Sequence, residues 1–347
     1  MDEILPYPLL ALVGQSELKT ALILGLINEQ IGGVLLSGPY GVGKTTAVRS
    51  LLDILPLIET EETDEHGNPI TSRTAMRLVE LPLNARMEDV VGGINERIAL
   101  EQRQIQLEEG VLAKAHRNLL YIDEINLLDP RVTDAILDAA AQGHTLVRRG
   151  PMTRLFPTRF VLVGSMNPEE GLLRPQIMDR FGLRVWVAPL ADTTQRLDIY
   201  RRAQAFRADP AAFRSAYAAQ TAALREEVAI AREILTHVDI PAQAAELALA
   251  LIQELRIPSH RAEIALLEAA RARAAADFRN QVTTDDICRM APLTLRQRRS
   301  ETLEAYAAQV QTENTSIEAA LQRIIPQSGK TAPRRKRRSM MRELEEK

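Results

Sequence analysis

The sequence contains a single cysteine, Cys288, among its 347 residues. One thiol excludes an intramolecular disulfide and a metal site built on two cysteines. Aromatic residues make up only 4 % of the chain, so a core has to be built mainly from Leu, Ile, Val and Ala. This composition favours helices and parallel strands over an aromatic-rich fold made of strands alone.

Long apolar runs are missing as well. No uninterrupted stretch reaches the length of about 18 residues that a transmembrane helix needs. The first residues, MDEILPYPLLALVGQ, are acidic where a secretory signal is basic. The formal net charge of −3 argues against a nucleic-acid-binding surface over the whole protein. We therefore expect a cytoplasmic protein without a membrane span and without nucleic acid as a partner.

The first part of the chain, residues 1–192, alternates apolar runs with helical patterns, which is typical of a parallel α/β sheet. Strands are predicted at 33–37, 76–81, 119–124, 160–165 and 184–187. Because these runs are apolar almost throughout, we expect helices on both faces of the sheet. A helix is predicted over 44–55, directly after the first strand and a glycine-rich turn.

Three segments interrupt this alternation. Residues 58–72 are acidic and rich in turn-forming residues, so we expect an exposed loop there. Residues 87–110 form an insertion between two predicted strands. Residues 146–157 form a second insertion, whose pattern is typical of a hairpin with Gly150-Pro151 at its turn.

After about residue 192 the strand pattern ends, and Ala, Arg, Glu and Leu dominate. Helices are predicted at 226–235, 241–255, 260–278 and 284–298. Residues 193–300 are therefore interpreted as a linker and a small helical domain. Residues 301–347 are a C-terminal extension with a basic tail at 330–338, which we expect to be flexible or to form a short terminal helix. Such a cluster is most often solvated, although it can bind an acidic partner or nucleic acid.

The strongest motif is Gly38-Pro39-Tyr40-Gly41-Val42-Gly43-Lys44-Thr45, which matches G-x-x-x-x-G-K-[ST]. It stands between a predicted strand and a predicted helix, the context that this phosphate-binding P-loop requires. Its glycines let backbone N–H groups face phosphate oxygens, and the helix N-terminus adds partial positive charge. Lys44 can reach the β- and γ-phosphates, and the Thr45 hydroxyl can coordinate Mg²⁺. The motif and the adjoining Thr46 predict a site for ATP and Mg²⁺.

Polar residues follow two further strands. Asp123 and Glu124 end the strand LLYIDE, where Asp123 can join Thr45 in the Mg²⁺ shell and Glu124 can polarise the attacking water. Asn167 follows the strand FVLVGSM, and its amide could orient that water. A helix cap and an Asn-Pro turn are the alternative interpretations, but the P-loop upstream favours the hydrolytic roles.

With these motifs, the run LRPQIMDRFGL at 173–183 makes the chain resemble AAA+ ATPases, and more narrowly the I subunits of magnesium chelatases. The resembling segments cover most of residues 5–190, and their order and spacing together are specific. They lie at 13–15, 31–35, 81–84, 90–92, 113–117, 121–128, 166–171 and 174–183. The resemblance implies an α/β P-loop AAA+ domain followed by a small α-helical lid domain. It also implies that the insertions at 87–110 and 146–157 lie at the pore side, as in chelatases and MoxR-type remodellers.

Two arginines match functional residues of that family. Its D-R-F-G-L segment carries an arginine finger that reaches the ATP of the neighbouring subunit, and Asp179-Arg180 match it. A shared site implies a homo-oligomeric ring, for which six copies are expected from the resemblance, and Arg174 is a second candidate finger. Arg261 matches the lid arginine that senses the γ-phosphate, although its run S-H-R-A departs from the expected Leu-Arg-Gly-like run. Val13 and Gln15 belong to the segment that contacts adenine in such ATPases.

The resemblance implies the ATPase motor of a magnesium chelatase. Such a motor works with a second AAA+ subunit that bears an adhesion-type domain, and with a large porphyrin-binding subunit, to insert Mg²⁺ into protoporphyrin IX. A MoxR-like remodelling ATPase and a cobalt chelatase motor stay open as alternatives. Residues 58–72 lack the cysteine-bearing segment of many chlorophyll-pathway members, and the basic tail is not expected in the family. Both departures concern the metal that is inserted and leave the ATPase interpretation unchanged.

Overall fold

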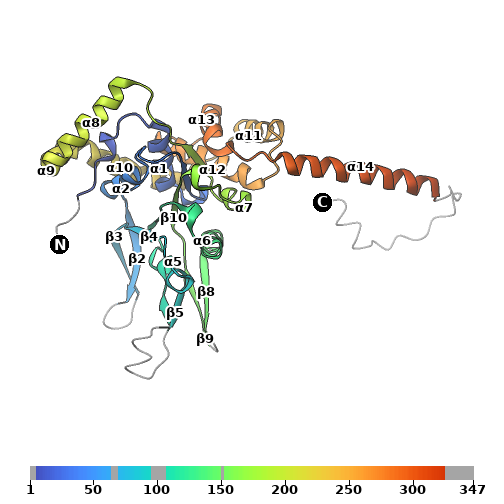
Figure 1. Ribbon diagram of the computed structural model, residues 1–347, viewed down its shortest axis with the longest axis horizontal. Helices are drawn as coiled ribbons and strands as arrows, with labels where there is room; N and C mark the ends of the chain where they lie inside the picture. The colour runs from blue at the N-terminus through green and yellow to red at the C-terminus, as the bar shows by residue number, and fades with distance from the viewer. Residues whose placement is uncertain (1–4, 64–68, 95–106, 150–151, 325–347) are drawn as a thin grey trace. The chain divides into compact units, whose positions relative to one another are not determined.

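The computed structural model describes residues 5–63, 69–94, 107–149 and 152–324. The contacts within the chain divide it into two compact units, Met1–Arg299 and Ser300–Lys347. The first unit contains the central sheet and most of the helices (Figure 1). The second contains one described helix, α14 (Glu301–Ile324), while the basic tail at 330–338 lies outside the described residues.

A five-stranded sheet forms the centre of the first unit, in the order β11-β1-β10-β7-β4. Its strands are β1 (Val34–Ser37), β4 (Leu78–Leu81), β7 (Leu119–Ile122), β10 (Val161–Met166) and β11 (Leu183–Trp186). All its pairings are parallel. The predicted fold class is confirmed, and each of the five predicted strands is present.

Helices cover both faces of this sheet because successive strand residues point to opposite sides. Val34 and Leu36 pack in one buried cluster with residues of α1 (Ser16–Ile27) and α2 (Lys44–Arg49). Leu35, between them, packs in the other cluster with residues of α6 (Pro130–Gln142). The sheet is therefore apolar on both faces, as its sequence predicts.

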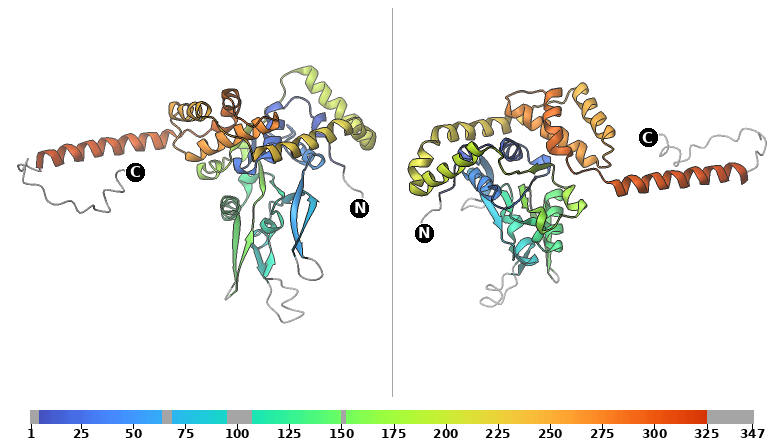
Figure 2. Two further views of the ribbon diagram at one scale, coloured as in Figure 1. Left: turned by 180° about the vertical axis from the view of Figure 1, so that it is seen from behind. Right: turned by 45° about the horizontal axis from the view of Figure 1, so that its top comes forward.

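Three antiparallel hairpins interrupt the described part of the α/β unit, and Figures 1 and 2 show them projecting in one direction. They pair β2 (Leu57–Thr63) with β3 (Pro69–Ala75), β5 (Gly92–Ile94) with β6 (Leu107–Glu109), and β8 (His144–Arg149) with β9 (Met152–Pro157). The last of these confirms the hairpin expected at 146–157, although Gly150-Pro151 lies outside the described residues.

The exposed loop predicted at 58–72 is wrong, because this segment forms most of the β2–β3 hairpin. Its backbone pairs Ile58 with Thr74 and Glu62 with Ile70. The segment alternates glutamate with threonine, and β-branched residues favour strands even where the overall composition is acidic.

The helical part of the first unit begins after β11. Its helices are α8 (Thr193–Ala208), α9 (Pro210–Ser215), α10 (Ala218–Leu235), α11 (Ala242–Glu254), α12 (His260–Ala276) and α13 (Thr284–Leu295). The four predicted helices correspond to α10–α13, and α10 begins eight residues earlier than predicted. The views of Figure 2 show α12 and α13 side by side, in agreement with their contacts. Cys288 is exposed on α13.

Short helical turns complete the described structure. They are η1 (Leu9–Ala11), η2 (Glu29–Ile31), η3 (Ser50–Asp53), α3 (Met87–Val91), α5 (Val111–Lys114), η4 (Ile125–Leu127), η5 (Pro168–Glu170) and α7 (Pro175–Met178). The helix predicted at 44–55 is therefore α2 followed by η3. Nowhere in the described ranges is a helix both long and apolar enough to cross a membrane.

Candidate active site

The carboxyl ends of three neighbouring strands bring the predicted site together. Ser37, the last residue of β1, pairs with Met166 of β10, and Ile122 of β7 pairs with Gly164 of the same strand. The segments that follow these strands therefore meet at one edge of the sheet. They enclose a cavity of about 240 Å³ lined by Tyr40, Gly41, Val42, Gly43, Lys44, Thr45, Thr46, Asp123, Glu124 and Asn167.

The P-loop backbone needs its glycines for two different reasons. Gly41 has φ 73° and Gly43 has φ 90°, conformations that other residues rarely adopt. Gly38 instead needs the space, because an added Cβ would lie 2.4 Å from the Val187 carbonyl oxygen. No atom would lie within 4 Å of a Cβ at Gly41 or Gly43, so the inner side of the loop is open to a phosphate group.

Lys44 spans the loop. Its Nζ donates hydrogen bonds to the carbonyl oxygens of Gly38 at 2.6 Å and Pro39 at 2.9 Å. Partial burial lowers the pKa of Lys44, and the nearby carboxylates of Asp123 and Glu124 partly oppose this shift. The two hydrogen bonds place the ammonium group of Lys44 at the P-loop, where a bound phosphate would lie.

The Mg²⁺ end of the site is a hydrogen-bonded cluster around Asp123. Thr45 Oγ1 donates to Asp123 Oδ2 at 3.0 Å, and the Tyr121 hydroxyl donates to Oδ1 at 2.8 Å. Ser165 donates a short hydrogen bond to the same Oδ1. Burial acts to raise the pKa of Asp123, but the hydrogen bonds from Ser165, Tyr121 and Thr45 outweigh it, and the pKa is lowered. The carboxylate is therefore ionised at neutral pH.

The oxygen atoms of Thr45 and Asp123 fit Mg²⁺, which prefers oxygen ligands and few protein groups. Among the described residues, no group of three or more His, Cys, Asp or Glu side chains could hold a metal ion by itself. An ion at this position therefore requires further ligands from a nucleotide and from water. This is the usual arrangement for Mg²⁺ that binds together with a triphosphate.

Glu124, the residue after Asp123, also lines the cavity. Its backbone is left-handed, with φ 51°, and its N–H donates to Ser165 Oγ at 3.1 Å. Burial first, and then the charges of Glu170 and Asp123, raise the pKa of Glu124. A carboxylate with a raised pKa is a better proton acceptor near neutral pH.

Asn167 caps the turn that follows β10 and also lines the P-loop cavity, while its role toward the attacking water stays a prediction. It is 1 % exposed, and its Oδ1 accepts a hydrogen bond from Glu169 N at 3.2 Å, which caps η5. It also lines the same cavity as Lys44 and Glu124. The Asn-Pro turn is therefore the local structure that positions this amide.

Val13 and Gln15 lie next to the P-loop but outside its cavity. Gln15 Nε2 donates to the Ala188 carbonyl at 2.8 Å. Ala188 follows Val187, whose carbonyl lies against Gly38. The end of β11 thus connects the 13–15 segment to the P-loop, and contact with adenine stays a prediction.

Two predicted arginines, the finger Arg180 and the lid γ-phosphate sensor Arg261, lie at the opposite edge of the sheet. Arg180 and Arg261 line a cavity of about 350 Å³ beside Gly33, which precedes β1. Arg180 forms an ion pair with Asp138 at 2.8 Å, and its buried Nη1 has no hydrogen-bond partner among the described residues. Arg261 lies 3.5 Å from Asp179. Neither arginine lines the P-loop cavity of its own chain.

Arg174, the second candidate finger, forms an exposed ion pair with Asp134 at 2.8 Å. It precedes α7, so it lies on the same segment of chain as Arg180. Both residues contact α6, through Asp134 and Asp138 respectively.

Comparisons with known proteins show which family this chain resembles. A family model described as magnesium chelatase, subunit ChlI, matches residues 9–174, and a model of the AAA lid domain matches residues 243–324. A magnesium-chelatase subunit ChlI homolog from Methanocaldococcus jannaschii is 42 % identical over 83 % of this chain and 84 % of its own length. The magnesium-chelatase 38 kDa subunit of Acidiphilium rubrum is 40 % identical, over 84 % of this chain and 90 % of its own length.

The chain belongs to the magnesium-chelatase ChlI family. It is therefore an AAA+ ATPase, and membership of the family implies the use of a nucleotide and Mg²⁺. A crystal structure of a candidate ATPase from Cytophaga hutchinsonii is 20 % identical and covers 91 % of this chain and 92 % of its own, with a TM-score of 0.57. That likeness bears on the fold alone, which is the AAA+ fold of the ChlI family.

Several residues of this ChlI-family site were not predicted. Tyr121 and Ser165 each precede a predicted site residue by two positions, on β7 and β10. The strand period of two places such residues on the same side as Asp123 and Asn167, so this signal could have identified them. Arg298 contacts Asp179, the residue before Arg180, from 119 positions away in the sequence. No local sequence pattern indicates this contact.

Proposed function

We propose that this chain is the ATP-hydrolysing motor subunit of a magnesium chelatase. In this function, ATP turnover drives the insertion of Mg²⁺, as a substrate, into protoporphyrin IX. The observation that carries the proposal is the P-loop cavity, in which Lys44, Asp123 and Glu124 meet in a member of the ChlI family. The names of the relatives favour a chelatase over a MoxR-like remodelling ATPase.

Each predicted side chain has a role in hydrolysis. The loop N–H groups and Lys44 hold the phosphates, while Thr45 and Asp123 hold the nucleotide-bound Mg²⁺. The ion supplies positive charge to the phosphate oxygens. Glu124 accepts a proton from the attacking water as its oxygen bonds to the γ-phosphorus, and the bond to the β–γ bridging oxygen breaks. Asn167 orients that water.

The site is completed by a neighbouring chain. Arg180 and Arg261 lie at the amino edge of the sheet, and the P-loop cavity of the same chain lies at the carboxyl edge. In a ring, the amino edge of one copy faces the nucleotide of the next, and Arg180 then stabilises the charge that develops in the transition state. We propose a homo-oligomeric ring of six copies in the cytoplasm.

Two further subunits complete the proposed enzyme. One is a second AAA+ subunit with an adhesion-type domain, and the other is a large subunit that binds the porphyrin. We propose residues 1–192 as the nucleotide-binding domain, 193–300 as the linker and lid, and 301–347 as the extension.

Reconstitution with candidate partner subunits tests this function. The assay follows the fluorescence of the metalloporphyrin product after mixing the chain with partners, ATP, Mg²⁺ and protoporphyrin IX. We expect insertion only with the intact chain and none with Lys44→Ala, which loses nucleotide binding or turnover. Replacing Mg²⁺ by Co²⁺ distinguishes a cobalt chelatase. Absence of stimulation by the intact chain, with partners active alongside a known motor subunit, would contradict the proposal.

A further inference from the structure

The short segment that carries Arg180 is held from the lid by a buried arginine. Arg298 follows α13, and its side chain is 1 % exposed. Its Nη1 donates to Asp179 Oδ1 at 2.7 Å and to the Asp179 carbonyl at 3.2 Å, while Nη2 donates to the Phe181 carbonyl at 2.9 Å. Two of the carbonyl groups that it binds, those of Asp179 and Phe181, belong to the residues on either side of Arg180.

A second buried arginine makes the reverse connection. Arg184, at the start of β11, donates to the carbonyl oxygens of Gln297 at 2.7 Å and Arg296 at 3.1 Å. It also donates to the Met178 carbonyl at 2.5 Å. The segment before β11 and the chain after α13 are therefore linked in both directions by guanidinium groups, whose planar donor arrangement fixes several acceptors at once.

The carboxylate of Asp179 also contacts other residues of the lid. Besides Arg298, it accepts a hydrogen bond from Ser259 Oγ at 2.8 Å and lies 3.5 Å from Arg261. Arg180 itself contacts α6 through Asp138 and makes no ion pair with these lid residues. The backbone at Arg180 is thus anchored by its neighbours, while its own side chain forms a partly exposed ion pair with Asp138.

We propose that Arg298 is a positioning residue for the arginine finger Arg180. By binding the carbonyl groups of Asp179 and Phe181, it fixes the backbone from which Arg180 extends toward the adjacent subunit. The inference rests on the proposed function, in which Arg180 completes the neighbour's nucleotide site. Catalytic groups must be held within a fraction of an ångström, and a misplacement of about 1 Å can lower a rate about 100-fold.

The first test compares three variants by steady-state ATP turnover and by binding of a fluorescent ATP analogue. Arg298→Met should lower kcat roughly 10- to 100-fold and leave nucleotide affinity unchanged, because the P-loop of the same chain lies at the other edge of the sheet. Arg298→Lys should give an intermediate kcat, since one ammonium group cannot serve all the acceptors of a guanidinium.

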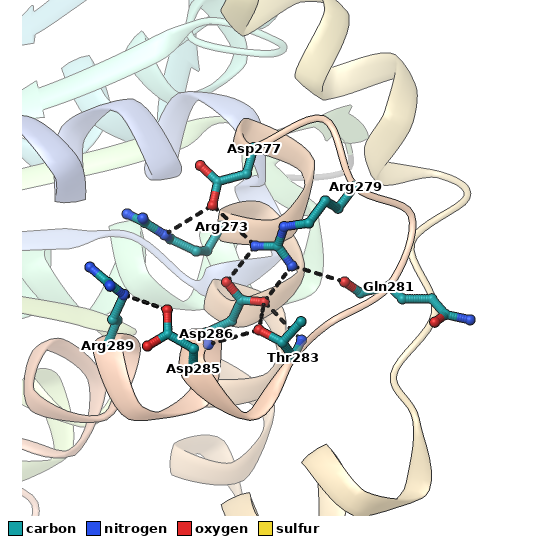
Figure 3. Close-up of polar contacts among 8 residues, drawn as sticks. All are labelled: Arg273, Asp277, Arg279, Gln281, Thr283, Asp285, Asp286 and Arg289. Atoms are coloured by element: carbon teal, nitrogen blue, oxygen red, sulfur yellow. Dashed lines mark hydrogen bonds and ion pairs between the residues drawn. The ribbon is translucent and has the colours of Figure 1, made fainter.

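Arg279→Met is the matched control. Arg279 pairs with Asp286 at 2.7 and 2.8 Å, and Asp286 is 1 % exposed (Figure 3). This pair is in the lid, and its hydrogen bonds among the described residues do not reach Asp179, Arg180 or Phe181. The variant therefore removes the partner of a buried carboxylate without touching the finger. It should melt at a lower temperature but keep wild-type kcat below that temperature. Equal losses of kcat in Arg279→Met and Arg298→Met would mean that Arg298 only stabilises the lid.

The second test uses mixed rings. Lys44→Ala lacks a working P-loop but has a correctly held Arg180, so it can supply the finger to the P-loop of an Arg298→Met neighbour. Random mixing of equal amounts places roughly one site in four between an intact P-loop and a correctly held finger. Mixing the inactive Lys44→Ala with the impaired Arg298→Met should therefore raise turnover above that of either variant alone.

A mixture of Arg180→Ala with Lys44→Ala distinguishes a failure of the positioning role of Arg298 from a failure of the shared nucleotide site. If this mixture regains activity and the Arg298→Met mixture does not, Arg298 does not act through the finger and the inference is overturned. If neither mixture regains activity, the shared site of the proposed function is wrong, and the inference fails with it. Should Arg298→Met fail to assemble, the single variant Arg298→Lys decides the matter, because an unchanged kcat would contradict the positioning role.

Discussion

The two edges of the central sheet hold their functional side chains in different ways. At the carboxyl edge, Asp123 is hydrogen-bonded by Tyr121 and Ser165, which lie on strands of the sheet, and by Thr45 in the first turn of α2. At the amino edge, Arg180 lies in a segment held by the lid, and its Nη1 is without a hydrogen-bond partner in the described ranges. The groups of the first edge are hydrogen-bonded to one another within one chain, whereas the second presents an arginine that lies outside the P-loop cavity of its own chain.

The largest effect on ATP turnover is expected from a substitution at the amino edge. Arg180→Ala should lower ATP turnover about 10³- to 10⁵-fold, the contribution of arginine fingers in related P-loop enzymes. Nucleotide affinity of the isolated chain should stay close to wild type, because Arg180 is outside its own P-loop cavity. Steady-state turnover and equilibrium binding measure the two quantities separately. Normal turnover in this variant would refute the shared site, and Arg174→Ala then tests the alternative finger.

The next largest effect belongs to the carboxyl edge. Glu124→Gln should lower kcat about 10²- to 10⁴-fold, because the amide cannot accept the proton of the attacking water. ATP should still bind, since the groups that hold its phosphates are unchanged. Single-turnover hydrolysis with bound ATP measures the chemical step directly. Loss of binding together with hydrolysis would assign Glu124 to the nucleotide pocket instead of to proton transfer.

A smaller effect concerns the support of Asp123. Tyr121→Phe removes one donor to Asp123 Oδ1 and leaves the buried ring in place. We expect turnover to fall about fivefold, the equivalent of about 1 kcal/mol for one hydrogen bond. A Mg²⁺ titration of turnover should show a changed half-saturation. Tyr7→Phe is a useful control because the Tyr7 hydroxyl donates to the Ala11 carbonyl and not to a residue of the site. Equal turnover in the two variants would exclude a role for Tyr121.

The smallest expected effect is a shift in pH dependence. The pKa of Glu124 is raised by burial and by the charge of Glu170, so the ionised base is lost on acidification at a higher pH than for an ordinary carboxylate of pKa about 4.3. The acid limb of the kcat/KM profile, which reports the free enzyme, should therefore lie above that value. Glu170→Gln removes one cause of the shift and should move the limb to lower pH. A limb that stays in place would mean that another group titrates there.

The carboxyl edge was predictable from sequence because its information is local. A P-loop between a strand and a helix, and acids directly after a second strand, meet at the carboxyl edge of a parallel sheet in which these strands lie close together. Here only β10 separates β1 from β7. All ten residues that line the cavity were named from sequence, although their roles stay predictions. Tyr121 and Ser165 were missed, even though the strand period alone places them beside predicted residues.

The amino edge could not be predicted in the same way. Arg180 and Arg261 came only from family resemblance, and the bonds from Arg298 to Asp179 and Phe181 join segments more than 100 positions apart. Helix α8 was also missed, because no residue in it is buried and it lacks the apolar stripe that marks a packed helix. Tertiary contacts and exposed helices leave little trace in a hydrophobic pattern.

The solitary thiol of this chain has a practical consequence. Cys288 is exposed on α13, in the lid that holds the Arg180 segment. A maleimide fluorophore would therefore attach at one known position without prior removal of competing thiols. Its emission during a turnover cycle would report directly on the surroundings of the lid, in the native sequence and at the speed of the reaction.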